Sequence, residues 1–160
     1  MKMNYTKCSY LSWDKYNESP EIQILNGDVL FVKTGSTYGK SCVVHDLPCK
    51  ATINPQSIVF KNIKMNVKLF GYFLNSIYAY WQVEQTVVDS MIPTIAQSKI
   101  INYFIVLLDE LTQAQLADYL DKKCEKIDRL IASKQAKIEK LEQYKRSLIY
   151  EYVTGKREVV

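Results

Sequence analysis

A long uninterrupted heptad pattern near the C-terminus constrains this chain more than any other feature. The stretch 119–156 contains no proline, and no glycine before Gly155. Steps of three and four residues trace a seam that is apolar except for two lysines: Ala117, Leu120, Cys124, Ile127, Ile131, Lys134, Ile138, Leu141, Lys145, Leu148 and Tyr152. A strict repeat of about 3.5 residues keeps one stripe facing the same way only when helices supercoil about each other. The pattern therefore predicts a coiled-coil helix with a partner.

Both ends of this helix carry signals in the sequence. Thr112 and Gln115 have the spacing of a capping box, which predicts a helix start close to Thr112. Gly155 can adopt the left-handed conformation that ends a helix, and basic residues follow it, where positive charge is favoured. At about 1.5 Å per residue, the seam from residue 117 to 152 makes a rod of roughly 50 Å. The rest of the 160-residue chain is too small to cover such a rod.

The amino-acid composition indicates which class of protein this chain belongs to. Hydrophobic residues make up 48% and charged residues 24% of the chain, as in ordinary soluble domains. The longest apolar stretch, 100–108, is too short to span a bilayer, and the N-terminus lacks the apolar region of a signal peptide. The sequence thus predicts a cytoplasmic protein with no membrane partner. The net charge of +4 is too mild to indicate nucleic-acid binding by itself.

The residues that could carry chemistry form no recognisable constellation. The four cysteines, at positions 8, 42, 49 and 124, include no CxxC pair, and His45 is the only histidine. We therefore expect no metal site, no cofactor and no disulfide framework, with the cysteines as reduced structural thiols. His45 lies beside Asp46 without a serine or cysteine at motif spacing, so we expect no catalytic residues.

The region before the rod reads as a compact mixed domain. Short apolar runs bounded by Gly, Pro, Asn or Ser predict strands at 22–25, 29–32, 42–44 and 58–60. Between residues 67 and 85 the spacing becomes helical, and its stripe is expected in the core: Phe70, Phe73, Leu74, Ile77, Trp81 and Glu84. Residues 100–108 are expected to form a final strand or a buried connection. The predicted fold is α+β, with a small mixed domain at 1–110 and the long helical region at 111–160.

The loop KTGSTYGKS, residues 33–41, is the most informative segment of the first domain. Its glycines permit tight turns, and its remaining side chains offer donors suited to phosphates and base edges. A phosphate-binding P-loop needs four residues between its glycines and a helix afterwards, whereas only three separate Gly35 from Gly39 and a strand is expected next. A nucleotide site is therefore disfavoured. A plain polar hairpin and a DNA-facing loop both fit the residues.

Several segments together resemble one known family. They are GDVLFVKTGSTYGKS (27–41), ATINPQSIVF (51–60), the aromatic helix, and the helical region with its runs at 127–131, 141–145, 147–149 and 153–156. This order is similar to the distal part of a target-recognition domain followed by a helical conserved region in the DNA-specificity subunit of type I restriction-modification systems. The resemblance covers roughly residues 22–158. A family subunit carries two recognition domains and two helical regions, whereas this chain has one of each.

The resemblance implies a DNA-reading subunit without catalysis of its own. The domain would read half of a gapped site in double-stranded DNA. The long helix would form an antiparallel coiled coil and dock the methyltransferase (modification) subunit of the complex, with the restriction subunit as a further candidate partner. The candidate DNA contacts are Lys33, Thr34, Ser36, Thr37, Tyr38, Lys40, Asn54 and Gln56. Among these, Lys33 and Lys40 would bind phosphate, and Thr37, Asn54 and Gln56 could touch base edges.

The partner of the seam remains open at this level. The expected partner or dimer contacts are Leu120, Ile127, Ile131, Ile138, Leu141 and Leu148. One arrangement is a half-length subunit that restores two recognition domains by homodimerisation. Another is a fragment or exchangeable cassette whose helix pairs with a different specificity chain. A different class of function is an assembly or regulatory coiled-coil protein, or an inactive cassette, that does not itself read DNA.

Overall fold

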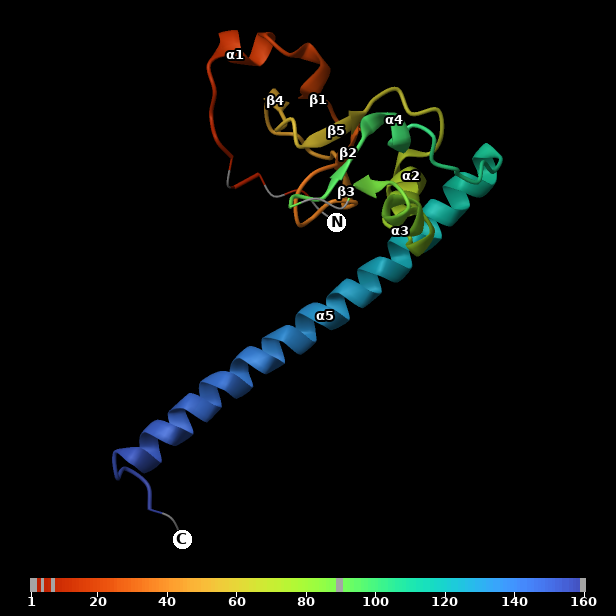
Figure 1. Cartoon of the computed structure of the whole chain (residues 1–160). Helices are drawn as coiled ribbons and strands as arrows, with labels where there is room; N and C mark the ends of the chain where they lie inside the picture. The colour runs from red at the N-terminus through yellow and green to blue at the C-terminus, as the bar shows by residue number, and fades with distance from the viewer. Residues whose placement is uncertain (1–2, 4, 7, 89–90, 159–160) are drawn as a thin grey trace. The chain divides into compact units, whose positions relative to one another are not determined.

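The computed structural model describes residues 3, 5–6, 8–88 and 91–158. The chain divides into two compact units between Ala117 and Asp118. The first is a mixed α+β unit with small antiparallel sheets, and the second is formed by a long helix, as the sequence predicted in outline (Figure 1). The boundary expected after residue 110 lies at the start of that helix, whereas the division between the two units falls after Ala117, so the first turns of the helix belong to the first unit.

Strand β2 (Val29–Val32) lies at the centre of the first unit. It pairs antiparallel with β3 (Ser41–Val43) on one side and with β5 (Ser57–Phe60) on the other. Because successive side chains alternate between faces, Val29 and Phe31 enter one apolar cluster while Leu30 enters a second. Both faces of β2 are therefore covered, which explains its continuous apolar sequence.

Two-stranded sheets extend this arrangement. Strand β1 (Gln23–Ile24) pairs with β4 (Ala51–Thr52), and β6 (Val87–Val88) pairs with β7 (Thr94–Ile95). Near the N-terminus lie the short helix α1 (Trp13–Asn17) and a single 3-10 turn, η1 (Pro20–Ile22). The four predicted strands exist, with each bound within one residue of the expected one. The two-residue strands β4, β6 and β7 were not predicted, because, unlike β1, they do not lie within a longer apolar run.

The aromatic segment forms two helices rather than the single predicted one. They are α2 (Val67–Leu74) and α3 (Ile77–Glu84). Asn75 ends α2, and the Ser76 hydroxyl caps α3 by accepting from the backbone N–H of Ala79 at 3.2 Å. This restart shifts the helical phase. The expected core residues Ile77 and Trp81 are consequently exposed, at 87% and 59%.

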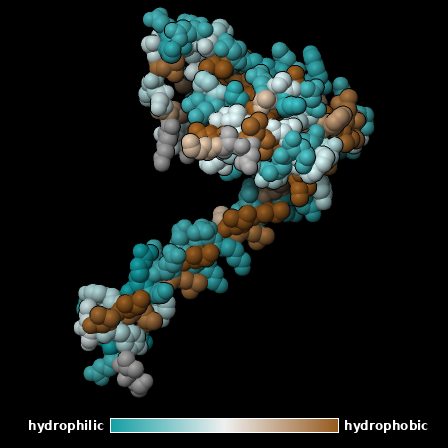
Figure 2. All heavy atoms as spheres, viewed as in Figure 1, coloured by the Kyte–Doolittle hydropathy of each residue, from teal (hydrophilic) through white to brown (hydrophobic). Residues whose placement is uncertain are grey.

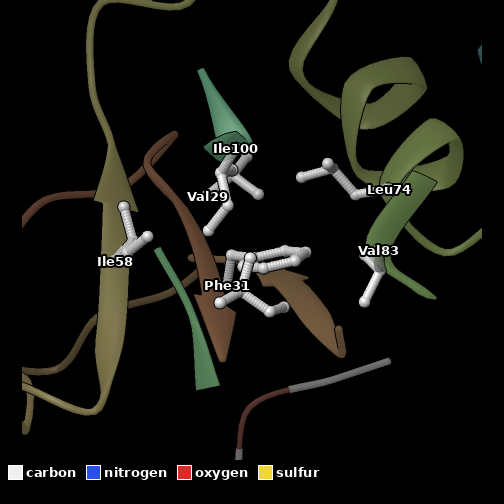
Figure 3. Close-up of a cluster of buried hydrophobic side chains, with 7 residues drawn as sticks. Val29, Phe31, Ile58, Leu74, Val83 and Ile100 are labelled. Carbon is white, nitrogen blue, oxygen red and sulfur yellow. The ribbon is translucent and has the colours of Figure 1, made fainter. Parts of the chain in front are cut away.

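The main core lies between the central sheet and these helices. Its buried residues are Val29, Phe31, Ile58, Leu74, Val83, Ile95 and Ile100. Figure 3 shows Phe31 in the middle, with Ile58 from β5 on one side and Val83 from α3 on the other. An aromatic series of edge and stacked contacts extends from the sheet into the helices: Phe31, Phe60, Phe70, Phe73 and Tyr78.

Helix α2 approaches β3 through a glycine. A Cβ atom built on Gly71 would lie 2.6 Å from Cγ2 of Val43, closer than any real carbon contact. The absence of a side chain at this position therefore sets the distance between α2 and the sheet. Asn75 reinforces the junction, because its Nδ2 donates to Oγ of Ser41 at 2.8 Å and to the carbonyl of Gly71 at 2.8 Å.

The expected strand or buried connection at 100–108 is not formed. Ile100 ends helix α4 (Gln97–Ile100) and is buried, but Phe104, Val106 and Leu107 are 70–77% exposed. The backbone of Phe104 is paired by a side chain instead of a neighbouring strand. Gln82 accepts from its N–H at 2.7 Å and donates to its carbonyl at 3.0 Å.

Helix α5 (Glu110–Val153) is 44 residues long. It begins two residues before Thr112, because the Asp109 carboxylate accepts from the backbone N–H of Thr112 at 3.0 Å and acts as the cap. Hydrogen bonds from the Thr112 hydroxyl and backbone lower the pKa of Asp109. The predicted capping box, with Thr112 as the cap, was therefore wrong. No helix among the described residues combines the length and apolar character needed to cross a bilayer.

Candidate nucleic-acid interface

The loop at residues 33–41 is a closed hairpin between β2 and β3. The N–H of Val32 donates to the carbonyl of Lys40, and the N–H of Gly39 donates to the carbonyl of Val32, both at 2.9 Å. Gly35 and Gly39 have φ values of +98° and +80°, which side-chain-bearing residues rarely adopt. A strand follows the loop, so the backbone has the hairpin geometry expected from the sequence rather than that of a P-loop.

Two separate segments, 93–95 and 54–56, hold this loop in place. The N–H of Gly35 donates to the carbonyl of Pro93 at 3.0 Å, and the carbonyl of Lys33 accepts from Ile95 at 2.8 Å. The N–H of Lys33 donates to the carbonyl of Gln56 at 3.0 Å. The structure thus brings the two predicted sets of DNA contacts, 33–40 and 54–56, to the same end of the central sheet.

The turn at 54–56 is also ordered by its own side chain. The Asn54 carbonyl Oδ1 accepts from the N–H of Gln56 at 3.0 Å, and the backbone carbonyl of Asn54 accepts from Ser57 at 3.0 Å. One acceptor position of Oδ1 is therefore used within the turn, while its second lone pair and the Nδ2 donors are available for other contacts. The Gln56 side chain is exposed beside it.

The candidate side chains differ in exposure. Ser36, Thr37, Lys40, Asn54 and Gln56 are exposed, whereas Lys33, Thr34 and Tyr38 are half-buried. A surface with two lysines, hydroxyls and carboxamides can bind phosphate oxygens and base edges without any covalent chemistry. The geometry leaves these contacts available at the end of the central sheet.

The sequence did not indicate the role of α3 in this site. The Tyr38 hydroxyl donates to Oε1 of Glu84 at 2.8 Å, which joins the loop to the end of α3. This hydrogen bond raises the pKa of Tyr38 to about 12, and the same carboxylate raises the pKa of Tyr80. The positions 38 and 84 are far apart in sequence, and only the break between α2 and α3 aligns them. An Asn-Ser pair at 75–76 was the available signal for that break.

A shallow cleft lies beside the loop. It has a volume of about 460 Å³ and is lined by the loop residues 36–40, the α2–α3 junction 74–76, and Tyr80. Gly39 forms part of the wall, and a Cβ atom there would lie 3.4 Å from Val83. The cleft is an open extension of the loop surface rather than an enclosed ligand cavity.

Among the described residues, no group of three or more His, Cys, Asp or Glu side chains is placed to hold a metal ion. All four cysteines are free thiols, with Cys8 and Cys49 exposed. The backbone carbonyl of His45 accepts from the Tyr5 hydroxyl at 2.6 Å, so this loop has a structural contact.

The second candidate interface is the seam of α5. The expected contacts Ile127, Ile131, Ile138 and Leu141 are 48–61% exposed, and Leu120 and Leu148 are half-buried. Figure 2 shows apolar side chains recurring along this helix between hydrophilic ones. The two seam lysines, Lys134 and Lys145, are exposed.

The C-terminal end of α5 has the predicted glycine cap. Gly155 has a φ of +70° and donates to the carbonyl of Tyr152, while the N–H of Lys156 donates to the carbonyl of Glu151 at 2.9 Å. This is the hydrogen-bond pattern of a Schellman motif. Lys156 also lies over the ring of Tyr150, with Nζ 4.5 Å from its centroid. The helix thus ends at a defined point.

No protein-family model matches the chain, and no curated protein matches it.

Proposed function

We propose that this chain is a non-catalytic DNA-reading subunit of a type I restriction-modification complex. The observation that carries the proposal is the backbone hydrogen bond between Lys33 and Gln56, which joins the loop at 33–41 to the turn at 54–56. Residues suited to phosphates and residues suited to base edges are thereby on one surface. The sequence resemblance of the same segments to specificity subunits supports the same function.

The helix supplies the other half of the proposal. An apolar seam that extends from Leu120 to Tyr152 and leaves Ile127, Ile131 and Ile138 exposed is unfavourable in water unless another helix covers it. In the proposed complex α5 pairs with a specificity helix and docks the methyltransferase subunit. Catalysis then belongs to the partner subunits, and this chain supplies the sequence preference.

The direct test is binding and methylation with the partner present. The chain is combined with the methyltransferase subunit of a type I system, and binding is measured by gel shift on a pool of randomised duplexes. Sequencing of methylated genomic DNA, from cells in which this chain is the only specificity component, gives the target. Two identical readers related by a two-fold axis would see identical half-sites, so the expected target is a gapped inverted repeat.

The other outcomes have definite meanings. A gapped asymmetric motif would show that the chain works beside a different specificity chain. A complex that forms with the methyltransferase but gives no motif and no selective gel shift would contradict DNA reading. It would favour an assembly or regulatory function, which the exposed seam alone is sufficient to support.

A further inference from the structure

The connection between α4 and α5, residues 103–109, is an extended stretch without a sheet (Figure 1). It contains no turn or bend, and its first side chains alternate between the interior and the surface. Tyr103 and Ile105 are half-buried, whereas Phe104 and Val106 are 77% and 70% exposed. A period of two is the pattern of a β-strand. The stretch therefore has the geometry of a strand, although no strand of the described chain pairs with it.

Two buried glutamines hold this stretch at its ends. Gln82 is 6% exposed and makes both backbone hydrogen bonds of Phe104. Gln113 is 4% exposed and donates from Nε2 to the carbonyl of Leu108 at 2.6 Å. Its Oε1 also accepts from the N–H of Asn66 at 2.7 Å, which fixes the stretch beside the loop that precedes α2. The position of the stretch is therefore set from inside the first unit.

The backbone groups between these ends point alternately to two sides. In an extended chain the N–H and C=O of one residue point to one side, and those of the next residue point to the other. Because Phe104 and Leu108 point toward the glutamines, Ile105 and Leu107 point away from them. Neither Ile105 nor Leu107 has a backbone hydrogen bond to any described residue. Residues 105–107 thus form an open edge, and such an edge is a template for pairing with another chain.

A pocket opens beside this edge. It has a volume of about 350 Å³ and a mainly apolar lining: Phe60, Lys61, Ile63, Lys64, Met65, Phe70 and Leu107. Leu107 lies on the same face of the stretch as Ile105, but its side chain is 72% exposed at the open pocket. Side chains of two paired strands are neighbours on each face of a sheet. A strand paired with Leu107 would therefore place one side chain at this pocket.

The charged groups at the pocket are positive. Its described lining contains two lysines and no carboxylate. Lys61 uses one ammonium donor on the carbonyl of Pro20 at 3.3 Å, which leaves two donors for other contacts. Asp109 is the first carboxylate after the edge along the chain, and it accepts from the N–H of Thr112 as the cap of α5. The pocket therefore suits a partner that brings its own carboxylate.

We infer that the edge at 105–107 docks an extended segment of a partner protein, which pairs with the backbone of Ile105 and Leu107 as an added β-strand. A large apolar side chain of this segment enters the pocket, and a neighbouring Asp or Glu reaches Lys61 and Lys64. The edge contains none of the candidate DNA contacts and lies outside the seam of α5. The inference therefore goes beyond the proposed function and does not rest on it.

Peptide selection on the full chain tests the chemistry of this partner. Short random peptides displayed on phage are selected on the wild-type chain, and binders that also bind the Leu107→Pro variant are discarded. This variant removes an N–H of the edge and leaves both pocket lysines in place. We expect enrichment of sequences with alternating apolar residues and an adjacent Asp or Glu. Enrichment of basic sequences, or of none that distinguishes the two proteins, would overturn the inference.

A neighbouring proline supplies the matched control. Val106→Pro changes an equally exposed residue whose N–H points toward the glutamines. It should keep the affinity of a selected peptide within about twofold, whereas Leu107→Pro should weaken it by about tenfold or more, as measured by titration calorimetry. Equal affinity of the two proline variants would overturn the assignment of the edge to Ile105 and Leu107.

A modified peptide gives a measurement that does not depend on the folding of a variant. The selected peptide is synthesised with N-methyl groups on one alternate set of amides or on the other. A paired strand must lose affinity with one set and keep it with the other, because only alternate residues face the edge. Equal affinity for both methylated forms would overturn strand pairing. Amide hydrogen exchange should also slow at residues 105 and 107 when the unmodified peptide binds, while Phe104 is protected in the free chain.

Two other occupants of the edge have distinct results. Exchange protection at residues 105 and 107 that appears with protein concentration alone, and is lost in Leu107→Pro, would identify a second copy and overturn the assignment to a different protein. Gel shift of Leu107→Pro on randomised duplexes should equal that of the wild type. A loss of DNA binding in a Leu107→Pro chain that keeps exchange protection at Phe104 would make the edge part of the DNA surface and overturn the inference.

Discussion

Strand β2 and helix α5 use similar apolar residues with opposite results. Val29 and Phe31 are fully buried, whereas Ile127 and Ile131 are 54% and 61% exposed. The first unit brings its own sheets and helices around β2, but α5 beyond Ala117 has no other element of its unit to cover it. Burial of an apolar side chain contributes roughly 1.5–3 kcal/mol. The first unit has already gained this energy, and α5 gains it only on association.

The largest expected effect is on the exposed apolar seam of α5. Replacing Ile131 and Ile138 with Asp should abolish pairing, because each buried unpaired charge costs several kcal/mol. We expect a loss of dimer affinity of at least about 100-fold, which corresponds to about 2.8 kcal/mol. Light scattering across a dilution series measures it.

A matched control adds the same charge outside the seam. The double variant Ala136→Asp with Gln143→Asp places two carboxylates on the outer face of the same helix. It should keep the mass and affinity of the wild type. If the seam variant also keeps the dimeric mass, the seam is not the interface.

The next effect concerns packing inside the first unit. Gly71→Ala should destabilise it by about 1–3 kcal/mol, because the new methyl group would overlap Val43. Helix propensity alone predicts the opposite sign, since alanine is favoured over glycine by about 1 kcal/mol. Urea unfolding followed by tryptophan fluorescence decides between the two.

The same site offers a rescue. In the Val43→Ala background, the methyl group of Gly71→Ala has room, so the second substitution should be neutral or stabilising. A destabilisation of equal size in both backgrounds would mean that the contact between α2 and β3 is not the cause.

These packing differences explain how far the sequence could predict the structure. The continuous apolar run at β2 and the heptad repeat of α5 are both strong sequence signals, and the strand and the long helix were predicted correctly. The predicted strand or buried connection at 100–108 was wrong, because an apolar run does not show whether a backbone partner or a covering element exists. Here the Gln82 side chain pairs with Phe104 in place of a strand.

The candidate site was predictable only in part. Glycine spacing and polar composition indicated the loop at 33–41 and the turn at 54–56, and the structure brings them together. Contacts from α3 were not predictable, because Ser76 restarts the helix and rotates Glu84 into reach of Tyr38. The aromatic spacing across this segment predicts one continuous helix, and a single capping serine is too weak a signal to indicate that the helix stops and starts again.

A third prediction sharpens the contrast between recognition and pairing. Alanine at Gln56, Asn54 or Thr37 should change sequence preference, by about 1–3 kcal/mol where a bidentate base contact is lost. Asn54→Ala should have the broader effect, because it also removes the acceptor that orders the turn. Gel-shift competition between target and randomised duplexes measures the preference. Equal losses on all sequences would assign these residues to general affinity.

The fourth effect is smaller and independent of sequence. Lys33→Ala or Lys40→Ala should weaken binding on every duplex and reduce the slope of log affinity against log salt by about one unit. Lys15→Ala is the control, because Lys15 is paired with Glu18 at 2.6 Å. Unchanged affinity and slope in both loop variants would make this loop a structural hairpin.

The smallest expected effect concerns the bond that joins the loop to α3. The hydrogen bond from the Tyr38 hydroxyl to Glu84 raises the pKa of Tyr38 from 10.0 to about 12. The folded state therefore holds the phenolic proton of Tyr38 more tightly than the unfolded state does. The bond therefore contributes to stability below pH 10 and loses its contribution as the pH rises toward about 12. Tyr38→Phe should remove this pH dependence while leaving the fold intact, and Tyr10→Phe, at a side chain that is 98% exposed, is the control. Urea midpoints at several pH values between 9 and 12, together with the difference in tyrosinate absorbance between wild type and Tyr38→Phe, measure it. If the absorbance difference between wild type and Tyr38→Phe shows Tyr38 titrating near pH 10 rather than near pH 12, the loop is not held to α3 in solution. The recognition surface would then form only on binding.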